Sequence, residues 1–237
     1  MRRFVTPAVK GCLSLVLTCV ASQAYAQQAS VLSSIRVTGA ATVAVNPDRA
    51  YVDVGVVTQM PQSQAAVSQN ALKLDAVLKS LRKALGANAD IKTNSYSLNP
   101  DYQYHASGGL PTISSYTATN VVRVTVDDLG KIGTVIDTAT GAGANRVPNI
   151  QFALKDEQSV RTQALHDAAV RARSEAEALA AALGLKVNRI VSVEEGGPVV
   201  VPVMFARAEA KSSPTTIEPG SIQVEANVTL TVEVSVR

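Results

Sequence analysis

The sequence contains no tryptophan and only two cysteines, Cys12 and Cys19. Both cysteines lie within residues 1–26, a segment that has the features of an export signal. Once this segment is removed, the chain has no thiol that could form a disulfide, attack a substrate or bind zinc. An apolar core must therefore hold the exported protein together, and roughly 210 residues are enough for one large domain or two small ones.

The export signal itself is recognised by three features. Arg2, Arg3 and Lys10 make its start basic, and the apolar run at residues 11–21 is too short to cross a bilayer as a helix. Small residues at positions 24 and 26 match a cleavage site, so we expect cleavage after Ala26. The pair Arg2–Arg3 lacks the rest of a twin-arginine motif, and we therefore expect Sec export to the periplasm.

An excess of charge is also missing. Three of the 22 basic residues and none of the 19 acidic residues lie in residues 1–26, so the exported chain carries no formal net charge. A nucleic-acid partner requires a basic surface that displaces counterions, and this composition does not supply one. We expect no nucleic-acid partner.

Residues that carry out catalysis are scarce. The only histidines, His105 and His166, are far apart in the sequence, and no G-x-S-x-G motif is present. We expect no cofactor, no metal and no enzymatic activity. An enzyme would require Asp48, Asp101, His105 or His166 to converge on one cleft.

The tripeptide Asn-Pro-Asp occurs twice, and we interpret both copies as turn chemistry rather than a pair of catalytic carboxylates. The first copy is expected to join strands 34–45 and 50–56 as a four-residue hairpin connection. The second falls inside a strand at 91–103, where a proline should mark a bulge, an edge or the end of the strand. The turn-forming residues are Asn46, Pro47, Asp48, Asn99, Pro100 and Asp101.

The remaining periodicity predicts an α+β fold. Apolar residues recur every three or four positions at 63–85 and 157–183, which indicates two long helices, and a short helix capped by Asp127 follows residue 126. The stripe of the second long helix is expected to consist of Leu165, Ala168, Ala172, Ala176, Leu179 and Leu183. Alternation with period two predicts about seven strands, most regular at 221–236. We expect one mostly antiparallel sheet with the three helices packed on it.

Residues 196–219 have the least regular pattern, and we interpret them as a loop. Within this loop an apolar stretch would be exposed, and exposed apolar patches usually mark interfaces. The candidate oligomer interface consists of Val199, Val200, Val201, Val203, Met204 and Phe205. The alternative, that the loop folds back on the sheet and the long final strand bends, stays open.

Several separated blocks resemble one family. The segments "ATVAVNPDRAYVDVGV", "IKTNSYSLNPDYQY", "YTATNVVRVTVDDLGKIGTVIDTATGAGANRV" and "ALHDAAVRARSEAEALAAALGLKVNRIVSVEEG" are similar to the SIMPL-domain family, a domain of unknown function. Its bacterial members include periplasmic immunogenic, outer-membrane-associated antigens. The resemblance implies an export signal, an α+β fold, large ring or channel-like oligomers and a loose link to oxidative stress. It implies no agreed catalytic residues.

We therefore expect a non-enzymatic periplasmic homo-oligomer that is either soluble or peripherally associated with the outer membrane. Residues 27–237 are expected to form a single SIMPL-like domain, and a further division into subdomains at about 34–110 and 111–237 stays open. The alternative function is a periplasmic module that binds a small molecule or an unfolded protein.

Overall fold

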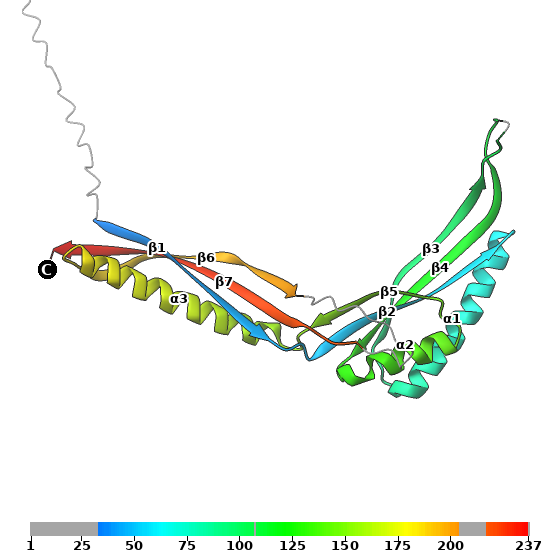
Figure 1. Ribbon diagram of the computed structural model, residues 1–237, viewed down its shortest axis with the longest axis horizontal. Coiled ribbons are helices and arrows are strands. Elements are labelled where there is room, and N and C mark those ends of the chain that lie inside the picture. Colours follow the sequence, from blue (N-terminus) through cyan, green and yellow to red (C-terminus); the bar gives the residue numbers. More distant parts are fainter. Residues whose placement is uncertain (1–32, 107, 204–216, 237) are drawn as a thin grey trace, which may run out of the picture. The chain divides into compact units, whose positions relative to one another are not determined.

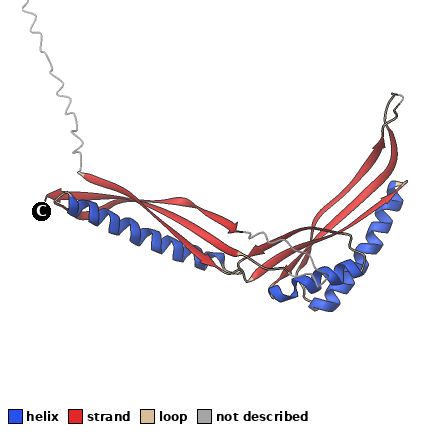
Figure 2. Ribbon diagram, viewed as in Figure 1, coloured by secondary structure: helices blue, strands red, loops and turns tan. Residues whose placement is uncertain are grey.

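The computed structural model describes residues 33–106, 108–203 and 217–236 (Figures 1 and 2). The expected leader at 1–26 lies outside these residues, as do Met204 and Phe205. The elements are β1 (Ser34–Val45), β2 (Arg49–Met60), α1 (Ser63–Leu85), β3 (Ile91–Gln103), β4 (Thr112–Val126), the 3-10 helix η1 (Leu129–Lys131), α2 (Ile132–Gly141), β5 (Arg146–Ala153), α3 (Glu157–Ala182), β6 (Leu185–Val203) and β7 (Ser221–Val236).

The strands form two sheets, with the orders β1-β7-β6 and β3-β4-β2-β5, and all neighbours in both are antiparallel. The predicted α+β class is confirmed, whereas the prediction of one sheet is wrong. The predicted hairpin between the first two strands is also wrong, because β1 pairs with β7 and β2 pairs with β4 and β5. Residues 46–48 instead carry the chain from one sheet into the other.

In the three-stranded layer, α3 covers one face of β1 and β7 (Figure 1). The strict alternation of β7 is confirmed: every second residue from Ile222 to Val234 is buried, and those between are half-buried. The buried face of α3 consists of alanines spaced four residues apart, namely Ala164, Ala168, Ala172, Ala176 and Ala180. The prediction that Leu179 and Leu183 belong to this stripe is wrong, since both are exposed.

The alanine stripe meets the sheet at a glycine. A Cβ atom added to Gly39 of β1 would lie 2.2 Å from the carbonyl oxygen of Ala168 and 2.4 Å from the backbone nitrogen of Ala172. The backbones of α3 and β1 therefore touch here with no side chain between them. Only glycine on the strand and small residues on the helix permit this approach.

In the four-stranded layer, α1 and α2 pack against the valine-rich face of β2 and β4. Val77 and Leu81 of α1 are fully buried there. Asn70 of α1 is also buried, and its amide nitrogen donates hydrogen bonds to the carbonyls of Val56 (2.8 Å) and Ala118 (3.0 Å). This side chain fixes the helix on two neighbouring strands, because burying the amide without those partners would be costly.

The second Asn-Pro-Asp lies within β3 rather than in a turn, and β3 is an edge strand. The pairing of β3 with β4 shifts register between Asp101 and Tyr102, so the prediction of an edge or a bulge at Pro100 is confirmed. Residue 110, the expected subdomain boundary, lies between these two paired strands.

Residues 199–203 were predicted as part of a loop, but they belong to β6 and pair with β7 from Val199↔Glu225 to Val203↔Ser221. Because β6 runs from Leu185 to Val203, the loop prediction is wrong for residues 196–203, eight residues in all. The register shift between Gly196 and Val199 explains why the alternation expected of a strand is broken in the sequence.

Replacing Gly39 with alanine should destabilise the protein by about 3 kcal/mol, because neither backbone at the contact can move away without disturbing its own hydrogen bonds. Urea unfolding measures the loss. Gly141→Ala is the matched control, since a Cβ atom there meets nothing within 4 Å. Equal stability of Gly39→Ala and the wild-type protein would contradict the close contact.

Candidate functional site

Side chains on the face of β2 and β4 that is turned away from the helices form a cluster of charges. Ala50, Val52 and Val54 are buried under the helices, so the residues between them project from the opposite face. Cross-strand pairing brings Tyr51 opposite Thr125 and Asp53 opposite Arg123. We call this surface the charged face, and define it as Arg49, Tyr51, Asp53, Asp90, Lys92, Arg123, Thr125, Asp127 and Lys155.

A buried ion pair lies at its centre. Arg123 donates two hydrogen bonds to Asp53, from Nε at 2.8 Å and from Nη2 at 2.9 Å, and the amide of Asn94 donates a third at 3.1 Å. Asp53 is only 3% exposed. The Arg123 guanidinium also lies 5.6 Å from the centre of the Tyr51 ring, within cation–π range. The hydrogen bonds to Asp53 raise the pKa of Arg123.

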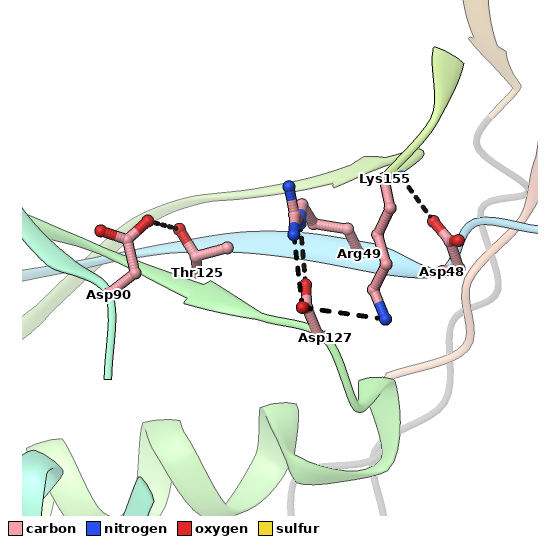
Figure 3. A network of polar contacts seen from close by, with 6 residues as sticks. All are labelled: Asp48, Arg49, Asp90, Thr125, Asp127 and Lys155. Atoms are coloured by element: carbon pink, nitrogen blue, oxygen red, sulfur yellow. Dashed lines mark hydrogen bonds and ion pairs between the residues drawn. The ribbon is translucent and has the colours of Figure 1, made fainter. Parts of the chain in front are cut away.

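A second pair marks the start of β2 (Figure 3). Arg49 donates to Asp127 at 2.7 Å and 3.3 Å, and the amine of Lys155 approaches the same carboxylate at 3.7 Å. The backbone nitrogen of Lys155 donates to the carboxylate of Asp48 at 2.7 Å. The prediction that Asp127 caps the short helix is wrong, because Asp128 accepts from the backbone nitrogen of Gly130 instead.

The third pair lies where β3 begins. Asp90 accepts from the Thr125 hydroxyl at 2.9 Å and pairs with the amine of Lys92 at 2.9 Å. A cavity of about 510 Å³ lies at this face, and it is lined by Arg49, Asp90, Lys92, Arg123 and Asp127 together with Tyr51, Asn88 and Thr125. Its walls present charges of both signs, each already matched by a neighbour.

The carboxylates of this cavity are arranged to stay ionised. The hydrogen bond from Arg49 lowers the pKa of Asp127, and the bonds from Lys92 and then Thr125 lower the pKa of Asp90. A general acid requires a raised carboxyl pKa, and neither group has one. Both carboxylates therefore act here as hydrogen-bond acceptors.

The residues that an enzyme would have needed lie on separate elements. Asp48 lies just before the first residue of β2, whereas Asp101 accepts a hydrogen bond from Gln59 near the other end of β2. Ten residues of strand separate these ends, roughly 33 Å. The hydroxyls of Thr117 and Ser115 on β4 donate hydrogen bonds to Asp101 on β3, so this carboxylate links the two strands. The bonds from Thr117 and then Ser115 lower the pKa of Asp101.

The two histidines are also apart. His105 lies in the loop after β3 and contacts the Thr112 hydroxyl at 3.2 Å, and His166 is on the exposed surface of α3. The side chains of His166 and the adjacent Asp167 lie 3.2 Å apart. Within residues 33–106, 108–203 and 217–236, no group of three metal-ligating side chains is found.

Sequence reasoning missed the central pair of the charged face. Asp53 stands among valines of a strand, a position where a charge is unusual, and this was the available signal. Its partner Arg123 is 70 residues away, and only the β2–β4 register connects the two.

Replacing Arg123 with methionine should cost about 2–4 kcal/mol of folding free energy, because the buried Asp53 would lose its charged partner. Chemical unfolding measures this cost. The double variant Asp53→Val/Arg123→Met should recover most of the loss, since it leaves no unpaired charge. If the double variant were no more stable than Arg123→Met, the buried pair would not be the cause.

Within the described part of the chain, no helix is long and apolar enough to cross a membrane.

Comparison with curated proteins finds relatives of similar length. The chain is 25% identical to a 26 kDa periplasmic immunogenic protein of Brucella melitensis over 195 residues, which cover 81% of this chain and 78% of the relative. It is 26% identical to the uncharacterized protein YggE of Escherichia coli over 196 residues, covering 80% and 78%. A YggE protein of Edwardsiella ictaluri is 26% identical over 155 residues, covering 65% and 64%.

The sequence profile of the SIMPL family, described as a protein of unknown function (DUF541), matches residues 35–232. The match runs from the second residue of β1 to Val232, the twelfth of the sixteen residues of β7, and it includes residues of every described strand and all the described helices. The chain therefore belongs to the SIMPL family.

Proposed function

We propose that the protein is a non-enzymatic periplasmic protein that acts as a homo-oligomeric assembly, ring-like or channel-like, and contributes to stress protection. The features of residues 1–26 and the periplasmic relatives in Brucella support the compartment. The family resemblance supports the assembly and the link to stress. The structural observation that carries the proposal is the open edge of β1.

β1 is an edge strand whose twelve residues pair with β7 without a register shift. The backbone nitrogen of Val234 donates to the carbonyl of Ser33, so odd-numbered residues of β1 bond to β7. Even-numbered residues from Ser34 to Ala44 therefore direct their N–H and C=O groups away from the sheet. A row of unpaired groups like this is a template for another strand.

The other three edge strands contain prolines and register shifts that hinder pairing with a further strand. β3 contains Pro100 and two register shifts, β5 contains Pro148 and one shift, and β6 contains two prolines and three shifts. Proline cannot donate to a neighbouring strand, and bulges turn an edge away from a straight partner. Among the described strands, β1 is therefore the edge best suited to pair with a second copy.

One outward group of β1 is already occupied. The guanidinium of Arg171 on α3 donates to the Ala40 carbonyl at 3.0 Å. This contact covers one acceptor and leaves the N–H groups of Thr38 and Thr42 available on either side. The residues 199–203 of β6, together with Met204 and Phe205 outside the described residues, stay a second proposed contact between subunits.

Replacing Thr42 with proline should weaken self-association by about tenfold or more, because it removes an outward N–H and places a ring on the pairing edge. The internal ladder to β7 is retained, since Thr42 does not donate to it. Light scattering coupled to size-exclusion chromatography measures the mass of each species.

Thr42→Ala is the matched control, because it keeps the N–H and should assemble like the wild-type protein. Circular dichroism verifies that the proline variant is folded. A wild-type protein that is monomeric at micromolar concentration would disprove the proposal.

A second candidate function is the binding of a small molecule, which the cavity of the charged face favours. Its lining includes the ion pairs Arg49–Asp127 and Lys92–Asp90, and a bound zwitterion would exchange its own charges with the partners in these pairs. Free amino acids should then raise the melting temperature, since a ligand that binds only the folded state stabilises it.

The rise should be smaller in Lys92→Met, which removes an exposed cation from the cavity wall. Unchanged melting temperatures of the wild-type protein with such zwitterions would exclude this candidate.

A further inference from the structure

The hairpin of β3 and β4 extends beyond the rest of its sheet. β2 pairs with β4 only as far as Met60↔Tyr116, so residues 112–115 of β4 pair with β3 alone. In Figure 1 the two strands continue past the ends of β2 and α1. We call residues 102–116 the arm. None of its described residues belongs to the buried core, and residues 102–106 and 108–114 are exposed.

The end of the arm exposes large apolar and aromatic side chains. Tyr102 is 52% exposed, Tyr104 78%, Leu110 88% and Ile113 47%. We call these four residues the hairpin tip. Tyr102 and Ile113 are cross-strand partners, so their side chains share one face. Gly108 and Gly109, with φ of 81° and 114°, adopt conformations that favour glycine and reverse the chain just before Leu110.

The arm is almost free of charge. Residues 102–122 contain no aspartate, glutamate, lysine or arginine, and His105 is their only basic side chain. Asp101, at the base of the tip, accepts hydrogen bonds from the hydroxyls of Thr117 and Ser115. A charged macromolecule would find no partner on this surface. Exposed apolar groups that carry no charges mark a surface that interacts with another apolar phase.

The structure points to the interfacial region of a lipid bilayer as the partner of the hairpin tip. Tyrosine is enriched at membrane interfaces because its ring is apolar and its hydroxyl remains hydrated. Leu110 and Ile113 would enter the acyl boundary, and the tyrosines would lie at the level of the headgroups. No helix is required to cross the membrane, and the contact is peripheral.

A second copy of this chain fits the arm less well. Pro100 has no N–H to donate, and the register shift at Asp101 and Tyr102 interrupts the edge of β3. The inference deepens the peripheral outer-membrane association that is one of the alternatives expected from the sequence, and it rests on the proposed function for its compartment. It does not require the β1 edge, so the two can fail independently.

The chain has no tryptophan, so a single tryptophan introduced at the tip is a specific reporter. The Leu110→Trp variant, purified after export as the full chain, is mixed with phosphatidylcholine vesicles. We expect its emission to shift to shorter wavelength and to be quenched by brominated acyl chains. Leu72→Trp is the matched control, because Leu72 on α1 is 69% exposed and lies outside the hairpin.

Vesicle flotation tests the same surface without a reporter. Leu110→Asp should lower the vesicle partition coefficient by about tenfold or more, the change expected when one buried leucine is lost. Leu72→Asp should float like the wild-type protein. Because the tip is uncharged, flotation should not require anionic lipids and should persist at high salt. Circular dichroism verifies the fold of each variant.

Three outcomes would overturn the inference. One is a wild-type protein that does not float with phosphatidylcholine vesicles. Another is binding that needs anionic lipid and disappears in salt. The third is a mass that falls in Leu110→Asp without any change in flotation, which would make a second copy the partner of the tip. A Thr42→Pro variant that is monomeric but still floats would separate this inference from the proposed assembly.

Discussion

The contact between the backbones of α3 and β1 at Gly39 sets the arrangement of the three-stranded layer. Because the helix backbone lies directly on the strand, the gap between α3 and the sheet has no room for large side chains. The five buried residues of α3 are accordingly alanines. The helix covers β1 and β7 and buries the even-numbered face of β7. α3 covers the face of β1, but it contacts the outer edge of β1 at one backbone group only. That contact is the hydrogen bond from Arg171 to the carbonyl of Ala40. The same packing that completes the core therefore leaves the edge available.

The two faces of each sheet differ in side-chain chemistry. Valine and alanine pack the strands against helices, and the opposite face of the four-stranded sheet carries three ion pairs whose opposite charges neutralise each other. Such pairs keep a sheet face soluble and in register without making it reactive. Among the described residues, the regular edge of β1 and the exposed hairpin tip are instead the surfaces best suited to contacts with other molecules.

Local pattern predicted the elements well, because periodicity records which face of an element is buried. The bounds of β1, α1 and β3 agree with the structure, and the alternation of β7 appears in its burial. Pairing could not be predicted in the same way. Asn46, Pro47 and Asp48 have the composition of a hairpin turn, but nothing local shows that β1 pairs with a strand almost 190 residues later. The same limit hid Arg123 from Asp53, and the bulges of β6 disguised residues 199–203 as a loop.

The topology also constrains the order in which this protein can be built. Residues 49–153 form the four-stranded layer without interruption, so its strands and helices can assemble as soon as that stretch is available. The first strand has no partner at that stage, because its neighbour β7 is the last strand of the chain and occupies the middle of its sheet. Closing so long a loop is slow compared with local pairing. During synthesis or translocation, β1 must therefore stay unpaired until β7 is available. A chaperone that binds the nascent protein would have to cover β1 longer than any other strand of the described chain.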